Sequence, residues 1–366
     1  MTNSSGQHKV RRVLIAEDMQ TSYHILKTII EQSPDFEIIG QARDGLEVVG
    51  KALELKPDII TMDIHMPKQS GLVAIEQIMT RNPIPIVVIS EHTRNREENL
   101  VFEALERGAI DVLAKPGSVM DDDFAVYAQT LRQKLLAFSE IKLVKRRPRF
   151  LEKQEKTTEL EIASAPEQSD KPVELVVLGA SAGGPEALLS ILSVMSDAFP
   201  LPIVIGQHIL NGFVDGMVNW LNQQCRLTVK VAMDHERLRP GVVYFSQDDR
   251  HLLVDRVNGE LQAVYSDAPP VKGFRPSIDR LLASAAKTCA GHLLGGILTG
   301  MGSDGADGLR QIYELGGETF VQDEATSLIY GMPAVAHDMG AAKQQLALDQ
   351  IPAYLCSFGR LLGEKV

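Results

Sequence analysis

Residues 58–67, DIITMDIHMP, contain a mostly apolar run that leads to an acidic residue, Asp63, and the stretch ends at Pro67. A short apolar run bounded by polar or turn residues is typical of a buried strand. Strands that alternate with helical segments of about 10–15 residues predict βαβ units and a parallel sheet. Four similar runs accompany DIITMDI (58–64): VLIAED (13–18), EIIGQA (37–42), IPIVVIS (84–90) and DVLAKP (111–116). Each of the five runs is followed by a segment with helical spacing, near 20–32, 45–55, 71–81, 96–107 and 122–138. We therefore expect an α/β domain in residues 1–138, a flavodoxin-like, doubly wound (βα)5 fold.

A charged segment separates this region from a second one. Residues 139–171 hold eight basic and seven acidic residues, a composition typical of a linker, which we place at 139–172. Its basic cluster favours a solvated charged face over a nucleic-acid site, because no aromatic residues alternate with it: Lys142, Lys145, Arg146, Arg147 and Arg149.

Strand and helix patterns resume at residue 174, so a C-terminal α/β domain with a mostly parallel sheet is expected in residues 173–366. Helical spacing occurs near 185–195, 213–223, 277–289 and 305–315. The strand candidates are ELVVLG (174–179), LPIVIGQH (201–208), LTVKVA (227–232), VVYFS (242–246), HLLVD (251–255), LQAVY (261–265) and HLLGGILTG (292–300).

Composition narrows the possible functions. The 366 residues include 37 Lys and Arg against 48 Asp and Glu, a net charge of −11 that argues against a nucleic-acid partner. No run of about 18 apolar residues is present, and the polar N-terminus predicts neither a membrane span nor a signal peptide. The three cysteines, Cys225, Cys289 and Cys356, form no C-x-x-C pair, which fits a reducing compartment. We expect a cytoplasmic protein.

Acidic and polar residues end several of the N-terminal strand candidates. The carboxyl ends of parallel strands meet at one edge of the sheet, so Glu17, Asp18 and Asp63 are expected to share a small volume. Such a group is unfavourable unless a cation neutralises it, and Mg²⁺ prefers carboxylate ligands. Ser90 and Lys115 end the fourth and fifth runs. Each residue alone is compatible with an ordinary polar strand end, but the whole set favours a site.

This set resembles the receiver domain of bacterial response regulators, over about residues 10–135. The resemblance implies that Asp63 accepts a phosphoryl group from a histidine kinase, and that Ser90 and Lys115 bind its oxygens. It implies that Mg²⁺ is held by the side chains of Glu17, Asp18 and Asp63 and by the backbone carbonyl of His65. One position departs from the pattern, because Val112 occupies the place where receivers usually carry Phe or Tyr.

The C-terminal half carries a second group of reactive residues. Residues 179–185, GASAGGP, place Ser181 in a G-x-S-x-G pattern between a strand and a helix, as in a nucleophile elbow. His208 ends the next strand candidate and can act as a base, and Asp304 in GMGSDG (300–305) can orient it. A plain glycine-rich turn is the main alternative for the elbow; the spacing is wrong for a dinucleotide loop. A metal site at Asp304, Asp307 and Asp323 is a weaker alternative.

The elbow, the histidine and GMGSDG together resemble the catalytic domain of the CheB family of chemotaxis protein-glutamate methylesterases. FRPSID (274–279) and the stretch from GG (316–317) to YGMP (330–333) extend the resemblance, which covers about residues 173–358. A receiver ahead of this domain is that family's own arrangement. The resemblance implies that Ser181 attacks the ester, that His208 acts as base and then acid, and that Asp304 holds His208. The backbone amide of Met301 would stabilise the oxyanion.

The implied reaction is hydrolysis of glutamyl methyl esters on chemoreceptors, which releases methanol, with deamidation of receptor glutamines as a second activity. The esterase step is expected to need no cofactor. Phosphorylation of Asp63 is expected to release an active site that the receiver otherwise covers. The implied partners are the chemotaxis histidine kinase and the chemoreceptors, with no nucleic acid and no membrane insertion, and the protein is expected to be a monomer.

Several positions depart from the family pattern. Ala182 stands where Thr is usual, Ile209-Leu210 replaces Met-Pro, Val214 replaces Thr, and SQDD (246–249) replaces an Ala-Pro-Gly turn. Two other functions therefore remain open at this point. One is the same triad acting on another ester or amide, and the other is a phosphorylation-dependent adaptor without catalysis.

Overall fold

The computed structural model describes residues 9–90, 98–116, 124–141, 172–209 and 211–363. The chain divides into two compact units, residues 1–155 and 156–366, each described by itself. The predicted basic cluster at 142–149 and most of the predicted linker lie outside the described residues. No helix in the described part of the chain is both long and apolar enough to cross a membrane.

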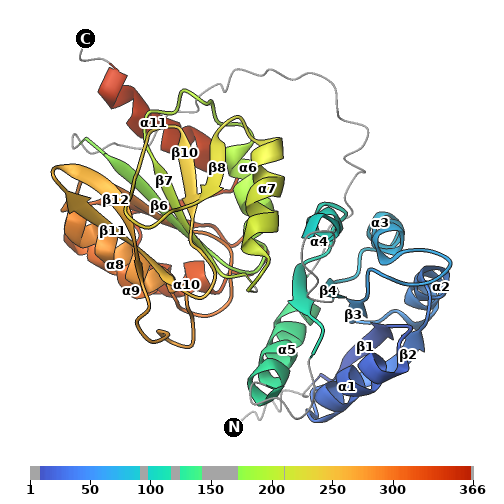
Figure 1. The fold of residues 1–366 in the computed structure, drawn as a ribbon. Helices are drawn as coiled ribbons and strands as arrows, with labels where there is room; N and C mark the ends of the chain where they lie inside the picture. Colours follow the sequence, from blue (N-terminus) through green and yellow to red (C-terminus); the bar gives the residue numbers. More distant parts are fainter. Residues whose placement is uncertain (1–8, 91–97, 117–123, 142–171, 210, 364–366) are drawn as a thin grey trace, which may run out of the picture. The chain divides into compact units, whose positions relative to one another are not determined.

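The described strands of the first unit form one five-stranded parallel sheet in the order β2-β1-β3-β4-β5. Helices cover both faces, with α1 and α5 on one side and α2, α3 and α4 on the other (Figure 1). The predicted doubly wound (βα)5 fold is confirmed. The elements are β1 (Arg11–Ala16), α1 (Gln20–Glu31), β2 (Phe36–Ala42), α2 (Gly45–Leu55), β3 (Ile59–Met62), α3 (Gly71–Arg81), β4 (Ile86–Ser90), α4 (Glu98–Glu106), β5 (Asp111–Ala114) and α5 (Phe124–Ser139).

Burial explains this architecture. Every residue of β3 and β4 is buried, as expected for strands that are covered by helices on both faces. The first strand ends at Ala16, two residues earlier than predicted, so Glu17 and Asp18 lie in the loop after it. Asp63 likewise follows β3 directly. The predicted starts of the fourth and fifth helices, at 96 and 122, fall outside the described residues.

The described strands of the second unit form a seven-stranded sheet, in the order β15-β14-β13-β6-β7-β10-β8, and a separate three-stranded antiparallel sheet, β11-β12-β9. All pairings in the larger sheet are parallel, which confirms the predicted α/β class. The strands are β6 (Leu175–Ala180), β7 (Ile203–Gln207), β8 (Thr228–Val231), β9 (Glu236–Arg237), β10 (Val242–Phe245), β11 (His251–Val257), β12 (Glu260–Ser266), β13 (Leu293–Ile297), β14 (Glu318–Gln322) and β15 (Gln344–Leu346).

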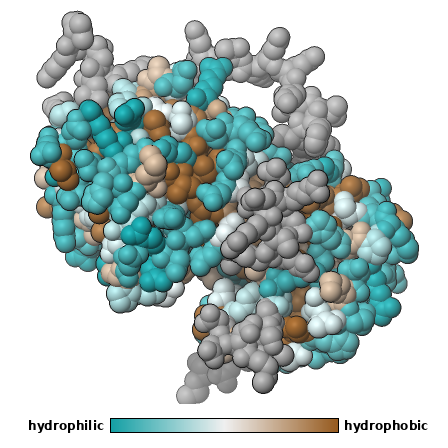
Figure 2. Space-filling model, in the orientation of Figure 1, coloured by the Kyte–Doolittle hydropathy of each residue, from teal (hydrophilic) through white to brown (hydrophobic). Residues whose placement is uncertain are grey.

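Helices pack on both faces of this sheet. In Figure 1, α6 and α7 lie on one side, and α8 and α9 lie on the other, where α8 also packs against β11. Hydrophilic residues cover most of the face seen in Figure 2, with a hydrophobic group over β7 and β10. The helices are α6 (Gly184–Leu192), α7 (Val214–Gln224), α8 (Ile278–Cys289), α9 (Ala306–Glu314), α10 (Met332–Asp338) and α11 (Ile351–Gly363). Because β6 lies between β13 and β7, the loops after these three strands share one edge of the sheet.

Candidate functional sites

The receiver-like unit has an acidic pocket at the carboxyl ends of its strands. Carboxylate oxygens of Glu17, Asp18 and Asp63 all lie within 4.8 Å of one another, the arrangement that the sequence predicts. Within the described residues, no other group of three acidic, histidine or cysteine side chains is placed to hold a metal ion. Lys115 Nζ lies 2.6 Å from Asp63 Oδ2 and 3.1 Å from Glu17 Oε2. One lysine thus pairs with two of the three carboxylates.

Burial makes this pocket electrostatically unfavourable. Glu17 is fully buried, and Asp63 is only 3% exposed. Loss of hydration raises the pKa of Glu17, and the neighbouring Asp63 charge raises it further. The pKa of Asp63 is also raised by burial, although Lys115 opposes the shift. Burial would lower the pKa of Lys115, but its bond to Asp63 and the negative charges around it outweigh burial and raise it.

The pocket fits a small divalent cation. Glu17 Oε2 is buried and, apart from its ion pair with Lys115, accepts no hydrogen bond from the described residues, so it keeps acceptor capacity for a metal ion. Oxygen ligands with negative charge are the set that Mg²⁺ prefers. The backbone amide of His65 donates to Asp63 Oδ1 at 3.0 Å, which fixes the loop; its carbonyl as a ligand stays a prediction. Ser90 is buried, and its Oγ has no hydrogen-bond partner among the described residues, so the hydroxyl can bond a new acceptor.

The Asp63 loop depends on a glycine. A Cβ at Gly71 would lie 2.1 Å from the backbone oxygen of Asp63, so a side chain at the start of α3 would displace the loop. Val112 pairs with Val88 in the sheet, and its half-buried side chain gives the predicted switch no aromatic ring at that position.

The serine turn of the second unit lies between β6 and α6. Gly183 has φ 76°, the left-handed conformation that favours glycine. The Ser181 amide donates to the Thr299 carbonyl at 3.0 Å, and the His208 amide donates to the Ala180 carbonyl at 2.9 Å. Ser181 and His208 therefore leave adjacent strands at the same edge, as predicted.

A buried glutamine joins the two residues. Gln207 Nε2 donates to the carbonyl of Ser181 at 2.9 Å and to the carbonyl of His208 at 2.8 Å. The absence of a side chain at Gly184 makes room for it, since a Cβ there would lie 2.0 Å from Gln207 Oε1. No role for Gln207 was expected from the sequence.

His208 is oriented from two sides. Its Nε2 lies 2.9 Å from Asp304 Oδ2, the pairing that the sequence predicts. The ring of Phe274 stacks on the imidazole, with centroids 3.9 Å apart and planes 4° from parallel. His208 Nδ1 is buried and has no hydrogen-bond partner in the described part of the chain, Ser181 Oγ included. Because Nε2 faces Asp304, Nδ1 is the ring atom left for the serine. Such a contact often tightens only when substrate binds.

Asp304 is 1% exposed and its carboxylate is fully hydrogen-bonded. Besides His208 it accepts from Ser277 Oγ at 3.0 Å, from the Ile278 amide at 2.8 Å and from the Asp279 amide at 3.0 Å. Burial alone would raise the pKa of Asp304, but the bond and charge of His208 and these donors lower it below its ordinary value. The carboxylate is therefore held in its charged form.

A free backbone amide lies beside the serine. Within the described part of the chain the half-buried Met301 amide donates to no acceptor. The preceding residue touches the serine turn, because a Cβ at Gly300 would lie 2.8 Å from Ser181 Cβ and 2.4 Å from Met332 Sδ. Met301 directly follows the residue that contacts the serine turn; its amide as an oxyanion donor stays a prediction.

Sequence reasoning missed the residues that support Asp304. Ser277 and Asp279 begin α8, and Ser277 Oγ accepts from the Arg280 amide as a helix N-cap. The available signal was Ser277 at the start of the predicted helix, because serine is a common N-cap residue. The alternative of a metal site at Asp304, Asp307 and Asp323 finds no support, since protein donors surround the carboxylate of Asp304.

Comparison with known proteins gives the same division. The response regulator receiver domain model matches residues 13–122, and the CheB methylesterase model matches residues 176–355. A Methanospirillum hungatei protein named protein-glutamate methylesterase/protein-glutamine glutaminase 2 is 37% identical over 97% of this chain and 99% of its own. The chain belongs to the CheB methylesterase family. The predicted family and class of enzyme are confirmed.

Two further proteins support this family assignment. A Myxococcus xanthus protein named protein-glutamate methylesterase/protein-glutamine glutaminase 4 is 40% identical over 96% of this chain and 98% of its own. The crystal structure of the Thermotoga maritima CheB methylesterase catalytic domain is 34% identical, with a TM-score of 0.50. It covers 50% of this chain and 98% of that one.

Proposed function

We propose that this protein hydrolyses glutamyl methyl esters on chemoreceptors, deamidates receptor glutamines, and is activated by phosphorylation of Asp63. Its family and the names of its relatives support the substrate class. The observation that carries the chemistry is the buried His208–Asp304 pair at the same sheet edge as Ser181.

The contacts of His208 and Asp304 support an esterase mechanism of the serine-hydrolase type. Ser181 Oγ attacks the ester carbonyl while His208 Nδ1 takes the hydroxyl proton, and Asp304 stabilises the imidazolium that forms. The Met301 amide donates to the oxyanion, an interaction worth about 3 kcal/mol in serine hydrolases. His208 then gives its proton to the departing methoxide, and methanol leaves. Water attacks the acyl-enzyme by the same route. Deamidation differs only in that ammonia leaves.

The receiver supplies the control. Glu17, Asp18, Asp63 and the carbonyl of His65 would hold Mg²⁺, which when bound neutralises the charge that develops during phosphoryl transfer. A histidine kinase donates the phosphoryl group to Asp63. Ser90 Oγ and Lys115 Nζ then bind its oxygens, which draws both from their present positions. In this proposal residues 1–138 regulate, 139–172 link, and 173–366 catalyse, in a cytoplasmic monomer.

The test is methanol release from membranes whose chemoreceptors carry tritium-labelled methyl esters, with and without Mg²⁺ and acetyl phosphate. We expect a basal rate that rises when both are added. No release under any condition, with Asp63 shown to be phosphorylated, would refute the esterase proposal and favour another substrate or an adaptor. Release that ignores phosphorylation would refute the gating alone.

A further inference from the structure

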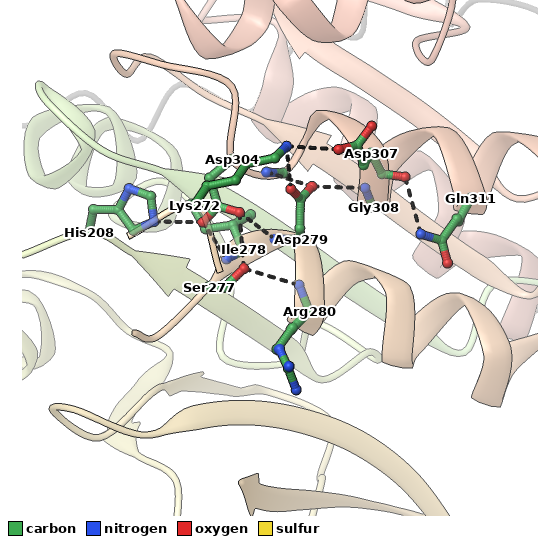
Figure 3. A network of polar contacts seen from close by, with 11 residues as sticks. His208, Lys272, Ser277, Ile278, Asp279, Arg280, Asp304, Asp307, Gly308 and Gln311 are labelled. Carbon is green, nitrogen blue, oxygen red and sulfur yellow. Dashed lines mark hydrogen bonds and ion pairs between the residues drawn. The ribbon is translucent and has the colours of Figure 1, made fainter. Parts of the chain in front are cut away.

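A polar network continues from Asp304 away from the triad (Figure 3). Its centre is Asp279, whose side chain is 11% exposed. The backbone amide of Asp279 donates to Asp304, while its Oδ1 accepts from the Gly305 amide at 2.8 Å and the Gly308 amide at 3.0 Å. Asp279 thus ties the first turn of α8 to the start of α9, immediately after Asp304. Asp279 therefore supports the position of Asp304.

Two buried carboxylates this close require a cation. Burial raises the pKa of Asp279, and the charge of Asp304 raises it further. Lys272 Nζ supplies the compensating charge, 2.8 Å from Asp279 Oδ2 and 2.7 Å from Asp307 Oδ2. These are the only ion pairs of Lys272 with described residues. The lysine therefore anchors its own segment to both helices.

The segment that carries Lys272 also carries the ring that covers His208. Val271 and Phe274 exchange two backbone hydrogen bonds of 3.1 and 2.9 Å, which closes a tight turn around Lys272 and Gly273. Both central residues have positive φ, 50° for Lys272 and 86° for Gly273. Phe274 leaves this turn and stacks on the imidazole. The anchor of the turn and the aromatic contact are two residues apart.

We propose that Lys272 is a positioning residue for the esterase reaction. Its ion pairs with Asp279 and Asp307 fix the 271–274 turn, and the turn holds Phe274 flat against His208, so that Nδ1 stays aimed at the serine. The same lysine neutralises Asp279 and thereby keeps the support behind Asp304 intact. Lys272 would thus act on His208 through Phe274 and through Asp304, and not by contact with substrate. This inference rests on the proposed hydrolase function.

The test uses the full chain and tritiated-methyl receptor membranes. We expect Lys272→Met to lower kcat by about tenfold with KM little changed, since a base displaced by a fraction of an ångström is poorly aligned but substrate contacts remain. Lys272→Arg should restore most of kcat, because it keeps the charge. The matched control is Lys343→Met: Lys343 pairs with buried Glu318 at 2.8 Å and is 31% exposed, against 38% for Lys272, but lies beside β14 and β15. It should keep the wild-type kcat.

A double variant distinguishes positioning of His208 through Phe274 from a general loss of rigidity. If Lys272 acts through Phe274, Lys272→Met should cost much less in a Phe274→Leu background than in the wild type. Equal costs in both backgrounds would overturn the route through Phe274, and equal kcat for Lys272→Met and Lys343→Met would overturn the inference as a whole. Thermal unfolding of each variant identifies any that fails to fold, and Lys272→Arg then carries the test. An inactive wild-type chain would instead refute the proposed function.

Discussion

The two sites of this chain lie at equivalent places, the carboxyl ends of parallel strands, but their buried carboxylates are in opposite states. Asp63 and Glu17 share one lysine, and their pKa values are raised. Asp304 accepts four hydrogen bonds, and its pKa is lowered. The receiver pocket therefore gains stability when a cation arrives. Asp304 is already stabilised by its four donors and has nothing to gain from rearrangement, as suits the preorganised catalytic group that we propose.

The largest effect is expected from removal of the proposed nucleophile, Ser181, or of its base, His208. Ser181→Ala and His208→Ala should each lower kcat by about 10³–10⁶-fold, and the double variant should be no worse than the poorer single one, because the residues act as a unit. Methanol release measures this, with Ser190→Ala in α6 as the control, since Ser190 Oγ donates to the Glu186 carbonyl within its own helix. Multiplying losses would contradict the triad.

Removal of the charge on Asp304 comes next. Asp304→Asn should lower kcat by about 10⁴-fold, since the imidazolium loses its counter-charge and His208 its tautomer. Ser277→Ala removes one of the four donors to Asp304 and should cost about tenfold or less, because three remain. If the two variants were equally impaired, the hydrogen bonds rather than the charge would be the deciding feature.

The third change addresses the receiver. Asp63→Asn should abolish stimulation by acetyl phosphate and Mg²⁺ while basal methanol release persists. Asp111→Asn is the matched control, because this aspartate also pairs with a lysine, Lys134 at 2.7 Å, but at the opposite end of β5. Stimulation that survives in Asp63→Asn would show that another residue receives the phosphoryl group.

The smallest effect concerns stability. Mg²⁺ at about 100 times its Kd should stabilise the receiver by about 2.7 kcal/mol, measured by thermal unfolding of the full chain, and Glu17→Gln should reduce this gain. Protons compete with the metal ion for the same carboxylates. Because the pKa values of Glu17 and Asp63 are raised above 4.5 and 3.8, the gain should fade with decreasing pH sooner than for ordinary carboxylates. A gain that is constant down to pH 4 would contradict the metal site.

The sequence predicted the parts of the fold that depend on local pattern. The apolar runs of a parallel sheet are recognisable in the sequence. Their ends predicted that Asp63, Ser181 and His208 lie at the carboxyl ends of strands, as the structure has them. The strand β14 was missed because its buried residues include Glu318, Thr319 and Gln322, so its sequence reads as polar. Glu318 is paired with Lys343 and Gln322 with backbone, contacts that only the folded chain supplies.

The supporting residues of the triad were beyond sequence reasoning for a related reason. Asp279 and Asp304 are 25 positions apart, and the bond between them exists because α8 and α9 pack with their first turns together. The role of Lys272 depends on the orientation of a turn with two positive φ values. Hydrophobic periodicity carries no information on either. The charged residues in FRPSID and VKGF are visible in the sequence, but their partners are not.

The amide of Gln207 has a further consequence for motion. Because one nitrogen binds the carbonyls of both Ser181 and His208, a shift of the serine turn is transmitted to the histidine backbone. We therefore expect this shared anchor to limit changes in the separation of the two residues, which are the proposed nucleophile and base.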